Sequence, residues 1–113
     1  MSSFALEGRV RVSIELALTA GIADPRLHDR QDVGARELGL SGAEIDAARL
    51  GRSFDVRTSI AIALALAARD GRDYSAERDR AARAGIDSRT CEEIIAFGRD
   101  ADSPALAGVG RSV

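Results

Sequence analysis

The feature that most constrains this fold is the apolar segment VRTSIAIALALAAR, which occupies residues 56–69. Asp55 precedes it as a suitable helix N-cap, and the charged sequence from Asp70 onward marks its end. The segment is shorter than the roughly 20 residues that cross a bilayer, so we expect a buried helix rather than a membrane span. Because it is apolar on nearly every face, neighbouring helices must cover most of its sides, and its alanines leave room for their backbones to approach closely.

Residues that cap and end helices divide the preceding part of the chain. We expect a first helix within the stretch EGRVRVSIELALTAG, closed by Gly21 at its carboxyl end. Asp24 followed by Pro25 should open a second helix, which Gly39 closes. The sequence SGAE at residues 41–44 then fits a capping box that opens a third helix.

Two further helical stretches follow the apolar segment, SAERDRAARAG and SRTCEEIIAFG. No part of the chain shows the sustained alternation of a strand. We therefore predict an all-α fold of about six helices, with a single domain over residues 1–100 and a flexible tail over residues 101–113.

Composition narrows the functions open to this chain of 113 residues. All 16 basic residues are arginines, but the net charge is −2 and the pI is near 5.4, which argues against a nucleic-acid surface. The single cysteine excludes an intrachain disulfide, and one cysteine with one histidine is too few for a metal-binding cluster. The sequence also has no phosphate-binding loop, so we expect no cofactor. No signal-peptide pattern is present, so a cytoplasmic location is expected.

The chain contains an internal repeat. A shift of 46 residues places VRVSIELALTAGIADPRLHDRQDVGARELGL on VRTSIAIALALAARDGRDYSAERDRAARAGI. The identities include Val10/Val56, Arg11/Arg57, Ser13/Ser59, Ile14/Ile60, Ala17/Ala63, Leu18/Leu64, Asp24/Asp70, Arg26/Arg72, Ala35/Ala81 and Gly39/Gly85. Because helix starts and closing glycines also align, we expect two tandem helical units, at about residues 10–50 and 56–97, that bury their apolar faces against each other.

The pattern A-x-x-x-G-L-S-x-x-E-I, from Ala35 to Ile45, resembles the carboxymuconolactone decarboxylase and alkylhydroperoxidase AhpD-like family. Residues 53–97 are similar to the second half of longer members, and the resemblance covers roughly residues 9–98. It implies an AhpD-like helical fold and a homo-oligomer, commonly a trimer or hexamer. The small size of the chain and its apolar helix independently favour an oligomer.

The dithiol chemistry of that family does not carry over to this chain. Its peroxidase-like members place a Cys-x-x-Cys pair and a His on one helix and a Glu on the preceding helix. Counted back from Gly39, these positions hold Asp24, Leu27, Gln31 and Val12; counted back from Gly85, they hold Asp70, Asp73, Glu77 and Thr58. Cys91 aligns instead with Ile45 and is expected to be a small buried apolar residue. The dithiol mechanism needs two thiols, so we expect no peroxidase activity of this kind.

The decarboxylase branch of the family relies on acid–base groups, and the RLH sequence at residues 26–28 resembles a fragment of that branch. His28 and Glu15 each lie three residues, one helical turn, from the family's His and Glu positions, on the same helix faces. A Glu15–His28 pair would be catalytic, moving a proton during decarboxylation or lactone isomerisation. Arg26 would hold a substrate carboxylate, and Gln31 would hydrogen-bond the substrate.

Two readings of the chain stay open. The first is a cysteine-free, decarboxylase-like enzyme acting on a small carboxylated or lactone substrate. The second is a catalytically inactive helical oligomer with a structural or ligand-binding role, in which Glu15 and Arg26 are solvated charges. A helix-turn-helix DNA-binding protein is less favoured. Its recognition helix would be the one that starts near Ser41, and this helix would present only Gly42, Ala43 and Glu44 to DNA at its amino end.

Overall fold

The computed structural model describes residues 4–101, which form six α-helices and, within this range, no strand. In chain order the helices are α1 (Gly8–Leu18), α2 (Pro25–Glu37), α3 (Gly42–Arg49), α4 (Val56–Arg69), α5 (Ser75–Arg83) and α6 (Ser88–Asp100). The prediction of an all-α fold of about six helices is confirmed. Of the expected tail, residues 102–113 lie outside the described residues, and Ala101 is the buried C-cap of α6.

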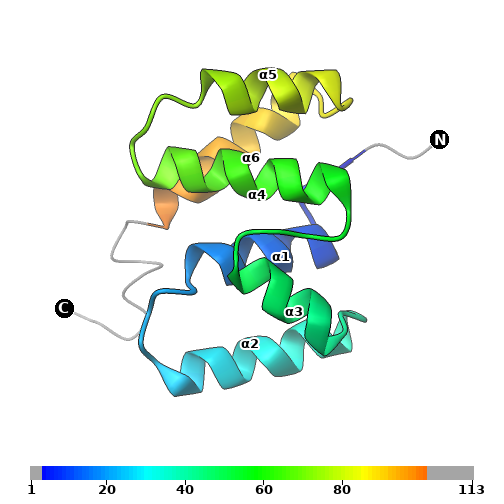
Figure 1. The fold of residues 1–113 in the computed structure, drawn as a ribbon, viewed down its shortest axis with the longest axis vertical. Coiled ribbons are helices and arrows are strands. Elements are labelled where there is room, and N and C mark those ends of the chain that lie inside the picture. Colours follow the sequence, from blue (N-terminus) through cyan, green and yellow to red (C-terminus); the bar gives the residue numbers. More distant parts are fainter. Residues whose placement is uncertain (1–3, 102–113) are drawn as a thin grey trace.

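Helix α4 lies in the middle of the molecule (Figure 1). It contacts α1, α5 and α6, and α1 in turn contacts α2 and α3. Helices α5 and α2 lie at opposite ends of the longest dimension, which measures 37 Å. Because α2 is at one end, its contacts are mainly with α1 and α3, and much of its surface faces solvent.

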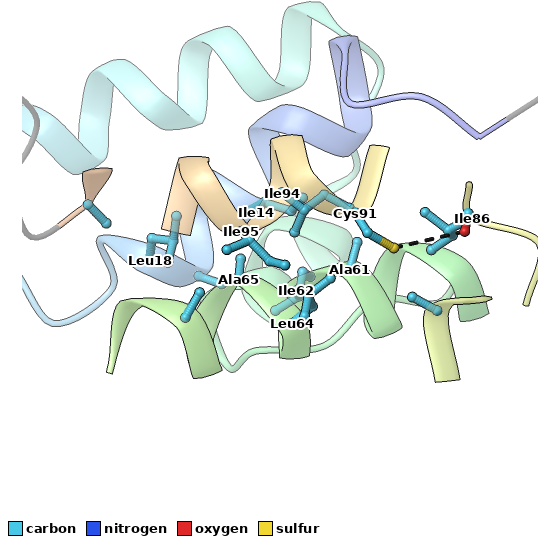
Figure 2. Packing of buried hydrophobic residues seen from close by; sticks show 14 of the residues in the cluster. Ile14, Leu18, Ala61, Ile62, Leu64, Ala65, Ile86, Cys91, Ile94 and Ile95 are labelled. Carbon is cyan, nitrogen blue, oxygen red and sulfur yellow. Dashed lines mark hydrogen bonds between the residues drawn. The ribbon is translucent and has the colours of Figure 1, made fainter. Parts of the chain in front are cut away.

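The apolar segment forms α4 over the expected residues 56–69. Val56 is its only exposed residue, because α1, α5 and α6 cover the remainder. In Figure 2, Ile62 of α4 lies among side chains of the neighbouring helices, including Ile14 of α1 and Ile94 of α6. The expectation that this helix is buried on most sides is therefore confirmed, and burial of its apolar surface is a main source of stability.

Helices α4 and α6 approach each other to the distance of backbone contact. At Gly98 of α6, a Cβ atom would lie only 2.3 Å from the carbonyl oxygen of Ala65 on α4. This spacing is possible because a glycine of α6 faces an alanine of α4. It agrees with the expectation that the alanines of this helix let a neighbouring backbone approach closely.

Most of the expected helix caps are present. The side chains of Asp24 and Asp55 accept hydrogen bonds from first-turn N–H groups of α2 and α4, respectively. Ser41 and Glu44 form a complete capping box at the start of α3. Gly39 follows the end of α2 with a φ of 95°, in the left-handed region that glycine favours.

Helix α1 ends earlier than expected. Gly21 does not close it, because α1 ends at Leu18 and Gly21 does not adopt a positive φ. The Thr19 hydroxyl donates a hydrogen bond to the carbonyl oxygen of Glu15 at 2.8 Å, and the Arg69 guanidinium donates one to the carbonyl oxygen of Leu18 at 2.9 Å. These two donors satisfy carbonyl groups at the end of α1, so a left-handed glycine is not needed there.

Candidate functional site

A groove of about 270 Å³ lies between α1 and α2. It is lined by Val12, Glu15 and Leu16 of α1 and by Leu27, Arg30, Gln31, Gly34 and Ala35 of α2. Two of the four residues selected from the sequence, Glu15 and Gln31, therefore face the same space. The other two, Arg26 and His28, lie on α2 but are not among the lining residues.

The floor of the groove is apolar, and two of the residues that line it, Gly34 and Ala35, have little or no side chain to fill the space. Leu16, Leu27 and Ala35 are all buried. Leu27 and Ala35 are also the only buried residues of α2, so the packing of this helix against its neighbours is light. Gly34 adds no side chain, and apart from the adjacent backbone of α2 no atom of the described residues lies within 4 Å of the position that its Cβ would take. The space between the two helices consequently remains open.

Gln31 connects α2 to the end of α1. Its Nε2 donates a hydrogen bond to the Thr19 hydroxyl at 2.9 Å, and that hydroxyl donates to the carbonyl oxygen of Glu15 at 2.8 Å. This chain of bonds fixes the orientation of the Gln31 amide. Its Oε1 is buried and has no hydrogen-bond partner within the part of the chain that the structure describes.

His28 holds the loop between α1 and α2. Its Nε2 lies 2.7 Å from the carbonyl oxygen of Ile22, which can only accept, so Nε2 carries the proton. The carbonyl oxygen of His28 accepts a hydrogen bond from Arg49 at 3.1 Å, and Arg49 forms an ion pair with Asp32 at 2.8 Å. No hydrogen bond or ion pair among residues 4–101 joins His28 to Glu15. The side chain of His28 thus has a structural partner in the loop.

Glu15 and Arg30 are the two charged residues that line the groove. Glu15 is half-buried and Arg30 is exposed, and within residues 4–101 neither forms an ion pair. Sequence reasoning missed Arg30, because the resemblance of the RLH fragment directed attention to Arg26. Helical spacing contained the signal: Arg30 lies three residues after Leu27 and four before Gly34, which places all three on one face.

A second groove, of about 260 Å³, lies where α1, α3 and α4 meet, but its charged residues are already engaged. Arg9 and Glu44 form an ion pair at 3.2 Å. The hydrogen bond from the Ser41 N–H to Glu44, at 2.8 Å, holds the pKa of that carboxyl below its ordinary value. Asp55 accepts hydrogen bonds from the hydroxyl and the N–H of Thr58, which lower the pKa of Asp55 as well. These groups cap and connect helices, so the α1–α2 groove is the better candidate for a functional site.

The single cysteine lies in the core, away from both grooves. Cys91 is 2% exposed, and its Sγ lies 3.9 Å from the carbonyl oxygen of Ile86 (Figure 2). Burial raises the pKa of the Cys91 thiol and so disfavours the reactive thiolate. The expectation of a small buried apolar residue is confirmed. In addition, no three acidic, His or Cys side chains within residues 4–101 are grouped so as to hold a metal ion.

Comparisons of the chain with protein-family models, with curated proteins and with solved structures found no match. Within residues 4–101, no helix has both the length and the apolar character needed to cross a membrane. A function for the α1–α2 groove therefore has to be inferred from the chemistry of its own residues.

Proposed function

We propose that this chain is a divergent member of the carboxymuconolactone decarboxylase and AhpD-like family and that its two halves are tandem units. The bounds of the helices support the tandem units: the end of α2 and the start of α3, at Glu37 and Gly42, lie 46 residues before the end of α5 and the start of α6, at Arg83 and Ser88. The turns that follow α2 and α5 are also alike, and the turns after α3 and α4 share their geometry. The turns after α2 and α5 each contain a glycine of positive φ, 95° at Gly39 and 89° at Gly85. After each glycine, the next N–H donates to the helix carbonyl five residues back, at 3.0 Å in the first half and 2.9 Å in the second. The next helix then starts at an N-capping side chain, Ser41 or Asp87.

On this scaffold, the α1–α2 groove is a binding site for a small organic carboxylate, and the protein acts through ligand binding rather than dithiol chemistry. The observation that carries this proposal is Arg30, a guanidinium that lines a groove with an apolar floor and that forms no ion pair with any other residue of the range 4–101. A guanidinium donates paired hydrogen bonds to a carboxylate, while Leu16 and Leu27 contact the apolar part of the ligand. Arg30 takes the role that the sequence suggested for Arg26.

The volume of the groove limits the size of the ligand. Drug-sized molecules occupy pockets of roughly 300–1,000 Å³. The α1–α2 groove, at about 270 Å³, is smaller. It therefore suits a ligand of fewer heavy atoms, whose dissociation constant is expected to be on the order of 1 mM.

Titration of isotope-labelled protein with isocaproate, followed by NMR, tests this proposal. We expect saturable shift changes at amides of α1 and α2. Arg30→Gln should weaken binding about tenfold, because it removes a charge-assisted hydrogen bond. Arg26→Gln removes the same charge from the same helix, but outside the groove, and should leave binding unchanged. Equal losses in the two variants, or no saturable binding by the wild type, would contradict the proposal.

An acid–base lyase is the second candidate function, and the position of Glu15 favours it. A carboxylate that lines a ligand groove without an ion pair is available as a general base. His28 would contribute only after leaving the carbonyl oxygen of Ile22. Assays of product formation from small lactones and carboxylates test this candidate. Turnover that is lost in Glu15→Gln but kept in His28→Gln would identify Glu15 as the base, and the absence of turnover in the wild type would exclude these reactions.

Finally, we propose that the chain forms a homo-oligomer, a trimer or hexamer by family resemblance. Apolar side chains at the α3–α4 connection support this: Leu50, Phe54 and Val56 are each 70% exposed. A second copy that covers them would remove apolar surface from water. Light scattering at micromolar concentration should give about three or six times 11.9 kDa, and a monomeric mass would contradict the proposal.

A further inference from the structure

Two opposite charges face the α1–α2 groove from different helices without pairing with each other. Glu15 comes from α1 and Arg30 from α2. Within the described residues neither has an ionic partner, whereas in the second groove Arg9 and Glu44 form an ion pair at 3.2 Å. A ligand that enters the α1–α2 groove displaces water from both charges. Arg30 is exposed and keeps part of its water, but pairing of both charges requires a ligand that supplies a partner for each of them.

A simple carboxylate meets only half of this requirement. It provides a partner for Arg30, but it brings a second negative charge into a groove that Glu15 already lines. The apolar floor of Leu16 and Leu27 lowers the local dielectric and strengthens this repulsion. A ligand that also carries an ammonium group places a positive charge toward Glu15, and the repulsion becomes an attraction.

We infer that the ligand of the α1–α2 groove is a small amino acid with an aliphatic side chain; this inference rests on the proposed function of the groove as a ligand site. The carboxylate binds Arg30, the ammonium group binds Glu15, and the aliphatic side chain packs on Leu16 and Leu27. An α-amino acid carries both charges on one carbon atom, with its apolar part extending away from them. Its small size also matches the volume of about 270 Å³.

Three probes of nearly the same shape separate the contributions of the two charges. L-Leucine carries both charges, isocaproate lacks only the ammonium group, and isoamylamine lacks only the carboxylate. Each is titrated into the wild-type protein and its dissociation constant is measured by NMR. We expect L-leucine to bind about tenfold more tightly than either of the other two, because it forms one more charge-assisted interaction than each of them.

Variants assign the preference for L-leucine to one side chain. Glu15→Gln should weaken the binding of L-leucine about tenfold, to the level of isocaproate, and should not weaken the binding of isocaproate. Glu37→Gln makes the same chemical change at an exposed position of α2 outside the groove, and should alter neither affinity. A loss of L-leucine binding in both variants would overturn the role of Glu15.

The wild-type titrations distinguish failure of this inference from failure of the proposed function. Saturable binding of isocaproate that equals or exceeds that of L-leucine would overturn the amino-acid inference and leave the carboxylate site in place. Binding of isoamylamine as tight as that of L-leucine would overturn the role of the ligand carboxylate and, with it, both proposals. Absence of binding by all three probes would also overturn both.

Discussion

Replacement of Gly98 by alanine should destabilise the domain, although alanine normally stabilises a helix. At an open helix position, a Gly→Ala change gains roughly 0.5–1 kcal/mol. At Gly98 the new Cβ would lie 2.3 Å from the carbonyl oxygen of Ala65 and 3.0 Å from its Cα, and both are main-chain atoms of α4. Helix α6 must move away by about 1 Å to restore ordinary contact, which also loosens the packing between the two helices. Overpacking of this kind costs about 1–3 kcal/mol. Because no side-chain rotation relieves this contact, we expect the upper end of that range and a net destabilisation of about 2 kcal/mol.

Urea unfolding followed by circular dichroism measures this effect, and Gly34→Ala is the matched control. Gly34 lies inside α2, and within residues 4–101 no atom beyond the adjacent backbone of α2 lies within 4 Å of its Cβ position, so alanine there should stabilise the protein by about 0.5–1 kcal/mol. The two variants should therefore differ by about 3 kcal/mol in free energy of unfolding, with opposite signs relative to the wild type. A Gly98→Ala protein as stable as the wild type would refute the close contact between α4 and α6.

Three further predictions concern groups outside the groove floor. Asp55→Ala should cost about 1 kcal/mol of stability at neutral pH through loss of the α4 cap. Hydrogen bonds from Thr58 hold the pKa of Asp55 below its ordinary value of about 3.9. The stability difference between the wild type and the variant should therefore fade as the pH falls below about 4. A difference in urea unfolding that stays constant with pH would contradict the role of Asp55 as the cap. A thiol reagent should label Cys91 only when urea unfolds the protein, because the folded thiol is buried with a raised pKa; equally fast labelling of the folded protein would argue against this. NMR of the imidazole nitrogens should show the Nε2-protonated tautomer of neutral His28, whereas an Nδ1-protonated ring would exclude the bond to Ile22.

The helices were predictable where their signals are local. Asp55 and the apolar segment that follows it define α4 within one stretch of sequence, and the Ser41–Glu44 capping box spans only one turn. The end of α1 shows why other helix boundaries could not be predicted from the sequence. Its last carbonyl, on Leu18, is satisfied by Arg69, a residue 51 positions later in the chain. A tertiary contact of this kind has no local sequence signature, so the prediction that Gly21 closes this helix was wrong.

The candidate site was predictable as a face of two helices, but not as a set of contacts. The family resemblance pointed to Glu15 on α1 and Gln31 on α2, and both line the groove. His28 lies one turn before Gln31, at the start of α2, where the backbone of the preceding loop is the nearest partner. Its ring therefore bonds to Ile22 in the loop. Which side chains reach a neighbouring helix depends on where that helix begins, and sequence spacing alone does not supply this position.

Chemical-shift mapping with L-leucine tests the assignment of the α1–α2 groove as the functional site. Amide signals are recorded for the wild-type protein, free and at saturating L-leucine. We expect the largest shift changes at the groove residues of α1 and α2, including Leu16, Gln31 and Gly34. Changes centred instead on the second groove, around Arg9, Glu44 and Thr58, would contradict this assignment, as would spectra that both L-leucine and isocaproate leave unchanged.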